Sequence, residues 1–112
     1  MKTDPPLTQD KKLTVLCRVE PGCLGPDGQD HIKDFCTFTQ KEVESIYAKF
    51  IHWNIVPRDD KSLPEMQYQI GSKQLTHERA AKYLKLFGKD LEQLEEKLHE
   101  TIAHLINRYL KS

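Results

Sequence analysis

The clearest pattern of hydrophobic and polar positions lies at the C-terminal end, from Asp90 to Lys111. Hydrophobic residues recur there at intervals of three and four positions, namely Leu91, Leu94, Leu98, Ile102, Leu105 and Tyr109. At about 100° per residue these positions form one face of an α-helix, and polar side chains occupy the other face. Asp90 is a suitable N-cap, with Gln93 three residues further on. We therefore expect a long amphipathic C-terminal helix whose apolar face packs on the rest of the chain.

Alternation with a period of two predicts three β-strands, over residues 13–19, 51–56 and 65–70. Pro57 and Pro64 bracket the polar link between the last two segments, and proline stops strand pairing. We therefore expect these two strands to pair with each other. Their alternate positions are polar, which is typical of an antiparallel sheet that is covered on one face only.

The segment that follows Cys36 carries a strong local signal for the start of a helix. Thr39 and Glu42 have the spacing of a capping box, and Phe38 and Val43 have the spacing of a hydrophobic staple. We predict a helix from Gln40 to about Phe50. Residues 31–36 could form a short helical turn before it.

A further helix is predicted between the third strand and the C-terminal helix. Thr76 is its expected N-cap, and Gly88 is its expected C′ residue. The order of elements is then β-α-β-β-α-α. This order predicts an α+β fold with a small, mainly antiparallel three-stranded sheet and helices packed on one face. We expect residues 1–11 to form a flexible tail and residues 12–112 to form a single α+β domain.

Composition and charge favour a small protein that acts inside the cell. The chain has 112 residues, with 17 lysines and arginines balanced by 17 aspartates and glutamates. We expect no secretory leader, because the first residues form no apolar segment, and the sequence has no apolar run of the roughly 20 residues that span a bilayer. Three cysteines are too few, and odd in number, for a disulfide framework. We expect a cytoplasmic, reduced protein.

Positive charge gathers on the second predicted helix. Between Ser72 and Lys89 there are five basic residues and one acidic residue, Glu78. Four of the basic residues, Arg79, Lys82, Lys85 and Lys89, belong to this helix or its end. Because the chain as a whole is neutral, this asymmetry favours an acidic partner. The leading hypothesis is a binding or adaptor protein without catalytic activity and without a cofactor, which recognises an acidic protein through this basic helix face.

The competing hypothesis places a thiol or metal site at the glycine-rich loop after the first strand. Cys23 lies on this loop, with Asp27 and His31 close in sequence. The acidic residues nearby would raise the pKa of a thiol, which disfavours a reactive Cys23. The spacing of the glycines matches neither the dinucleotide-binding nor the P-loop pattern, so we expect a compact turn rather than a phosphate cradle.

A zinc site is the metal version of this alternative. Cys17, Cys23, His31 and Cys36 supply the right number and types of ligand for tetrahedral zinc. Their spacing matches no zinc knuckle or ribbon, and Cys17 and Cys36 fall on apolar faces. We therefore expect no bound metal.

Two further expectations concern nucleic acid and self-association. The zero net charge makes nucleic acid an improbable partner, and weak binding to it is the second alternative. The apolar face of the C-terminal helix is the face that a coiled-coil dimer would use, and a single chain would use it against its own sheet. We expect a monomer, with a dimer as the alternative, and no membrane contact.

Overall fold

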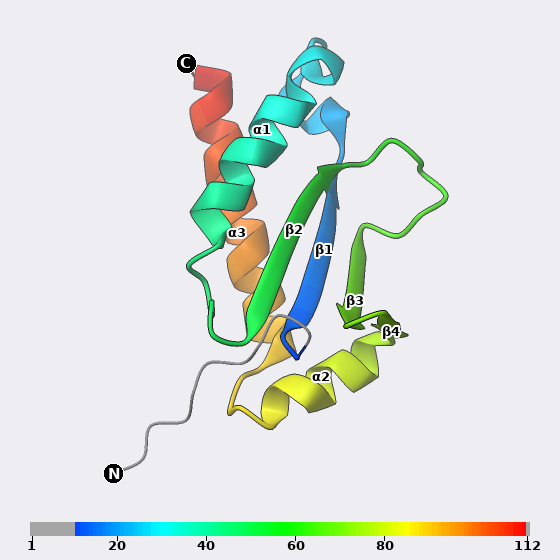
Figure 1. The fold of residues 1–112 in the computed structure, drawn as a ribbon. Coiled ribbons are helices and arrows are strands. Elements are labelled where there is room, and N and C mark those ends of the chain that lie inside the picture. Colours follow the sequence, from blue (N-terminus) through cyan, green and yellow to red (C-terminus); the bar gives the residue numbers. More distant parts are fainter. Residues whose placement is uncertain (1–10, 112) are drawn as a thin grey trace.

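The computed structural model of the protein describes residues 11–111 (Figure 1). In chain order the elements are β1 (Leu13–Val19), a short 3-10 helix η1 (Pro21–Leu24), α1 (Gly28–Val43), β2 (Ile51–Pro57), β3 (Met66–Ile70), β4 (Lys73–Leu75), α2 (His77–Lys85) and α3 (Leu91–Lys111). The tail expected over residues 1–11 falls outside the described residues, apart from Lys11. An α+β fold with a long C-terminal helix is confirmed.

The sheet differs from the predicted one in strand number and in pairing. It has four strands in the order β2-β1-β3-β4 and is mixed, because β1 is parallel to β2 and antiparallel to β3. The prediction of a three-stranded, mainly antiparallel sheet was therefore wrong, and so was the predicted pairing of β2 with β3. The reason is that β1, α1 and β2 form a β-α-β unit, in which the helix returns the chain so that the two strands run parallel.

Helices cover one face of this sheet. In Figure 1, α1 and α3 run antiparallel to each other across it, and α2 lies at the end where β1 begins. The side chains of Leu13, Val15, Cys17 and Val19 are buried, whereas the residues between them are half-buried. This is the alternation predicted for the first strand. The opposite face of the sheet carries exposed polar side chains such as His52 and Asn54.

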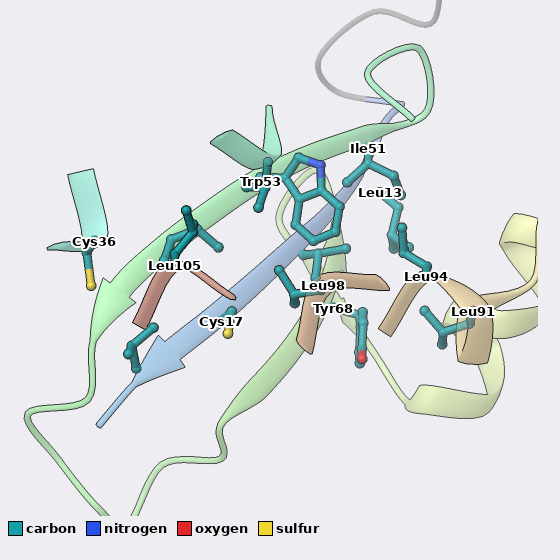
Figure 2. Close-up of a cluster of buried hydrophobic side chains, with 14 of the residues drawn as sticks. Leu13, Cys17, Cys36, Ile51, Trp53, Tyr68, Leu91, Leu94, Leu98 and Leu105 are labelled. Carbon is teal, nitrogen blue, oxygen red and sulfur yellow. The ribbon is translucent and has the colours of Figure 1, made fainter. Parts of the chain in front are cut away.

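The core lies between the sheet and α3. Figure 2 shows the side chains of Trp53, Tyr68 and Leu98 gathered in this layer. All three are at most 4% exposed. The indole N–H of Trp53 donates a hydrogen bond to the carbonyl oxygen of Ile46 at 2.9 Å, so the one polar atom of this ring has a partner.

Helix α1 begins and ends well before the predicted helix of residues 40–50. It spans Gly28–Val43, and Thr39 lies inside it as a fully buried residue instead of capping its start. Residues 44–50 form turns. The physical reason is the longer hydrophobic face, whose buried members recur at helical intervals: Ile32, Phe35, Cys36, Thr39 and Val43. A continuous buried face stabilises a helix more than one capping box does.

The ends of the last two helices agree with the prediction. The Thr76 hydroxyl accepts a hydrogen bond from the Arg79 amide at 3.2 Å. Asp90 Oδ1 accepts from the amides of Glu92 and Gln93 at 2.8 and 3.2 Å.

None of the helices within residues 11–111 is both long enough and apolar enough to cross a membrane. The short strand β4, at residues 73–75, was not predicted.

Candidate functional site

The basic residues singled out in the sequence lie on and just beyond α2. Arg79, Lys82 and Lys85 are exposed on this helix. Lys89 lies past the helix end, after Gly88, which has a φ of 72°. The amide of Gly88 donates to the carbonyl of Lys85, and the amide of Lys89 donates to the carbonyl of Leu84. These two bonds form a Schellman motif, which turns the chain sharply and sets the position of Lys89.

Lys89 is held by aromatic rings and is half-buried. Its ammonium nitrogen lies 4.7 Å from the ring centre of Tyr47 and 6.0 Å from that of Phe50. A cation within about 6 Å of an aromatic ring face is attracted by the ring quadrupole. The Phe50 ring in turn stacks on Phe87 with centroids 4.9 Å apart. Lys89 therefore lies beyond the end of α2, and its ammonium group rests against these rings.

The backbone of Tyr47 has a positive φ of 49°. Such a conformation is uncommon for a bulky residue and persists only where the surroundings hold it. Here the carbonyl oxygen of Tyr47 accepts hydrogen bonds from the amides of Phe50 and Ile51, both at 2.9 Å. This tight turn sets the phenol ring under Lys89. This turn could not be predicted from the sequence, because no glycine or asparagine marks the position.

A depression of about 370 Å³ opens beside these residues, where α2 ends and α3 begins. It is lined by Tyr47, Lys85, Gly88, Lys89, Asp90 and Gln93. The carboxylate of Asp90 is engaged by the two amides that it caps. Asp90 keeps its negative charge, so the lining carries two lysines and one carboxylate, a net positive charge that favours an anionic group.

One large apolar side chain stands among the basic ones. Leu86 is 77% exposed, more than any other large hydrophobic residue in the described part of the chain. We call the set Arg79, Lys82, Lys85, Leu86 and Lys89 the basic surface. Within it, Lys82 pairs with Glu78 at 3.5 Å, with side chains 75% and 80% exposed. Such an exposed pair contributes little to stability, so Lys82 is available to a partner.

Leu86 could have been found from the sequence. The buried positions of α2 are Ala80 and Leu84, with Tyr83 and Phe87 half-buried beside them. Leu86 falls outside the face that these four residues share. Leu86 is therefore an apolar side chain on the polar side of the helix, where it is open to contact by a partner.

The residues of the alternative thiol site lie around η1 and the start of α1. Cys23, Asp27 and His31 are all exposed. The His31 ring packs near the Tyr109 ring, with centroids 5.9 Å apart. No group of three or more histidine, cysteine, aspartate or glutamate side chains within residues 11–111 is placed to hold a metal ion.

The other two cysteines face the protein interior. Burial raises the pKa of the Cys17 thiol to about 12, with smaller contributions from Glu65 and Cys36. Burial likewise raises the pKa of the Cys36 thiol to about 11, with a smaller contribution from Asp59. At neutral pH both are therefore protonated thiols, which are poor metal ligands and poor nucleophiles.

The glycines of this loop serve its backbone geometry. A Cβ atom at Gly28 would lie 1.8 Å from the carbonyl oxygen of Pro21, and Gly25 has a φ of 91°. A polar depression of about 260 Å³ lies beside the loop, and Arg58 on its wall pairs with Glu20 at 3.2 Å. Two basic residues, Arg58 and Lys61, and two acidic residues, Glu20 and Asp59, line it, so this depression carries no net positive charge, unlike the basic surface.

The basic surface therefore combines four basic side chains, an exposed apolar side chain and a depression, and it is the candidate site. Comparison with protein families, curated proteins and solved structures gave no match to this chain.

Proposed function

We propose that the protein is a small binding or adaptor protein without catalytic activity, which recognises an acidic protein partner through the basic surface. The observation that carries this proposal is the exposed Leu86 among Arg79, Lys82, Lys85 and Lys89. Charged groups at a rim steer an oppositely charged partner and select it, while a central apolar contact supplies affinity. The partner is expected to present acidic side chains around one apolar residue.

The depression beside Lys85 and Lys89 refines this proposal. A glutamate or aspartate of the partner would enter it, where Tyr47 holds Lys89 in a fixed position. A charge that is already immobilised loses less conformational entropy on binding than a freely moving lysine. One copy of the chain is sufficient for this contact. A cytoplasmic setting belongs to the same proposal, and the free thiols of Cys17, Cys23 and Cys36 support it.

The test measures binding of the whole chain to a synthetic peptide of glutamates around one central leucine. The double variant Lys82→Glu/Lys85→Glu should lose binding at least about tenfold, because two attractive contacts become repulsive. Binding of the native chain should weaken as salt rises, since the Debye length falls from about 10 Å at 0.1 M to about 3 Å at 1 M. Leu86→Ala should weaken binding without changing its salt dependence.

A matched control changes the same number of charges elsewhere. Lys41→Glu/Lys97→Glu alters exposed residues of α1 and α3 and should keep native affinity. A single-stranded oligonucleotide is titrated in parallel, because the basic surface could also attract nucleic acid. Tighter binding to the oligonucleotide than to the peptide would overturn the proposal. Equal loss of peptide binding in the control variant would mean that only net charge matters, and would overturn it as well.

A further inference from the structure

A second depression lies on the outer side of the molecule between α1 and α3. It has a volume of about 440 Å³ and is lined by Asp34, Phe35, Phe38, Leu105, Arg108 and Tyr109. We call it the helix valley. Phe38 is 42% exposed, and Leu110, the residue after Tyr109 on α3, is 55% exposed. These are two of the four large hydrophobic side chains that are exposed in residues 11–111, and of the two only Phe38 lines the valley, because Leu110 lies beside Gly25.

Two opposite charges border the valley, one on each helix. Asp34 belongs to α1 and Arg108 belongs to α3. Their side chains form no ion pair or hydrogen bond with each other or with any other residue of the described chain. The valley therefore presents an acid on one rim, a base on the other and aromatic rings between them. A surface of this kind is complementary to itself.

We propose that the helix valley is the interface of a weak symmetric dimer, with a second copy of this chain as its occupant. A two-fold axis along the valley places α1 of each copy over α3 of the other. Because α1 and α3 run antiparallel within one copy (Figure 1), the helices that meet across the axis are also antiparallel. Asp34 of each copy then faces Arg108 of the other, and the Phe38 rings leave water. In such an isologous contact each charge pair forms twice.

The size of the surface fits a weak dimer. Helix α1 has 16 residues. At 1.5 Å per residue it is about 24 Å long, and two packed helices are about 20 Å wide. Contact along the whole of α1 would bury at most about 500 Å² on each copy, or about 1,000 Å² in total, which is the lower limit for a specific interface. We expect dissociation in the range of about 10 to about 100 µM.

This interface differs from the one that the sequence argument for a monomer considered. A coiled-coil dimer would use the apolar stripe of α3, whose residues Leu91, Leu94, Leu98 and Leu105 are buried within one chain. The helix valley lies on α1 and the C-terminal half of α3, at the end of the molecule opposite to α2 (Figure 1). Self-association there leaves the basic surface open, and it does not depend on the proposed function.

The test follows the mass of the full chain by sedimentation and light scattering from about 5 to about 500 µM. The native chain should change from monomer to dimer over this range. Asp34→Arg and Arg108→Asp should each raise the dissociation constant at least about tenfold, since each places like charges opposite each other twice. The double variant D34R/R108D exchanges the two charges, and it should return to within about threefold of the native constant. Phe38→Ser should abolish the dimer.

Glu100→Arg with Lys61→Asp makes the same charge changes at exposed positions outside the valley, and it should dimerise like the native chain. A native chain that stays monomeric throughout would overturn the proposal. So would a D34R/R108D variant that dimerises no better than the single variants. If the monomeric native chain binds 8-anilinonaphthalene sulfonate and Phe38→Ser does not, the valley is a site for a small apolar molecule instead.

Discussion

The side-chain amide of Gln40 on α1 closes the outer edge of β2 beside Trp53. Its Nε2 donates to the carbonyl oxygen of Trp53 at 2.7 Å, and its Oε1 accepts from the amide of Ile55 at 2.8 Å. Strand β2 is an edge strand, and an edge strand exposes backbone groups that can pair with another chain. The amide group occupies the place of a neighbouring strand for two of these groups. One half-buried side chain thus joins the crossover helix to the strand that follows it.

This relationship predicts a stability effect that depends on both hydrogen bonds. Gln40→Ala should lower the free energy of unfolding by about 1–3 kcal/mol, because it leaves a backbone donor and an acceptor without partners. Gln40→Glu keeps the acceptor for Ile55 and removes the donor for Trp53, so it should also destabilise the fold. Urea unfolding at neutral pH measures both, with the exposed Gln29→Ala as a control that should change little. A Gln40→Ala variant with native stability would mean that water replaces the amide without cost.

The faces of the strands could be predicted from the sequence, but their neighbours could not. Alternation in residues 13–19 identifies which side chains are buried, because successive side chains point to opposite faces. It carries no information about which strand lies alongside. The short polar link between β2 and β3 favoured a hairpin, whereas the actual neighbour of both is β1. The signal that would have helped is the helix between β1 and β2, since a crossover helix is typical of parallel strands.

At Thr39, tertiary packing outweighs the local capping motif. Substitution of this residue should therefore stabilise the fold, whereas substitution of an N-cap would destabilise it. As an N-cap it would stabilise the helix, so its loss would be costly. In the structure its hydroxyl is fully buried, and Oγ1 has no hydrogen-bond partner among the described residues. Thr39→Val keeps the shape of the side chain and removes a polar group that burial penalises. It should therefore raise the free energy of unfolding by about 1 kcal/mol.

Urea unfolding tests the Thr39 substitution directly. A matched change is Thr37→Val two residues earlier, where the hydroxyl is exposed and donates to the carbonyl oxygen of Lys33 at 3.0 Å. That change should be neutral within about 0.5 kcal/mol. If Thr39→Val instead costs about 1 kcal/mol or more, its hydroxyl has a partner such as a bound water molecule.

The apolar face of α3 was the clearest prediction from the sequence. The amount by which it stabilises the fold can be measured. Leu98 is fully buried near the middle of this helix. Leu98→Ala should lower the free energy of unfolding by about 2–5 kcal/mol, because it removes buried methyl groups and leaves a cavity. Leu86→Ala makes the same chemical change at a side chain that is 77% exposed and should cost less than about 0.5 kcal/mol. Similar losses from the two variants would contradict the packing of α3 on the sheet.

The candidate site was only partly accessible from sequence. Charge counting located Arg79, Lys82 and Lys85, because the exposed face of a helix follows from its periodicity. The position of Lys89 depends on a turn after the helix and on rings from residues 47–50. Contacts between segments so far apart in the chain cannot be predicted from the periodicity of hydrophobic residues. The depression beside Lys89 could not be predicted for the same reason.

Because two thiols are buried, the free energy of unfolding should change with pH in the alkaline range. The pKa of Cys17 is raised to about 12 and that of Cys36 to about 11, from an ordinary value near 9.0 in the unfolded chain. Above pH 9 the unfolded chain therefore releases protons that the folded chain retains. Stability falls with pH wherever the unfolded state binds fewer protons than the folded state. The contribution of each thiol is thus complete below about pH 9 and is lost as pH rises toward its folded pKa.

The free energy of unfolding should consequently decrease between about pH 9 and about pH 10.5, by up to about 1.4 kcal/mol per pH unit for each buried thiol. Cys17→Ala should reduce this slope by about that amount, even though the variant is less stable at neutral pH. Cys23→Ala changes the exposed thiol and is the matched control; its slope should equal that of the native chain. Urea unfolding at half-unit pH steps gives the slopes, and other groups that titrate in this range affect all three proteins alike. Equal slopes for the native chain and Cys17→Ala would show that the Cys17 thiol ionises as readily in the folded protein as in the unfolded one, and burial of β1 against α3 would not protect it.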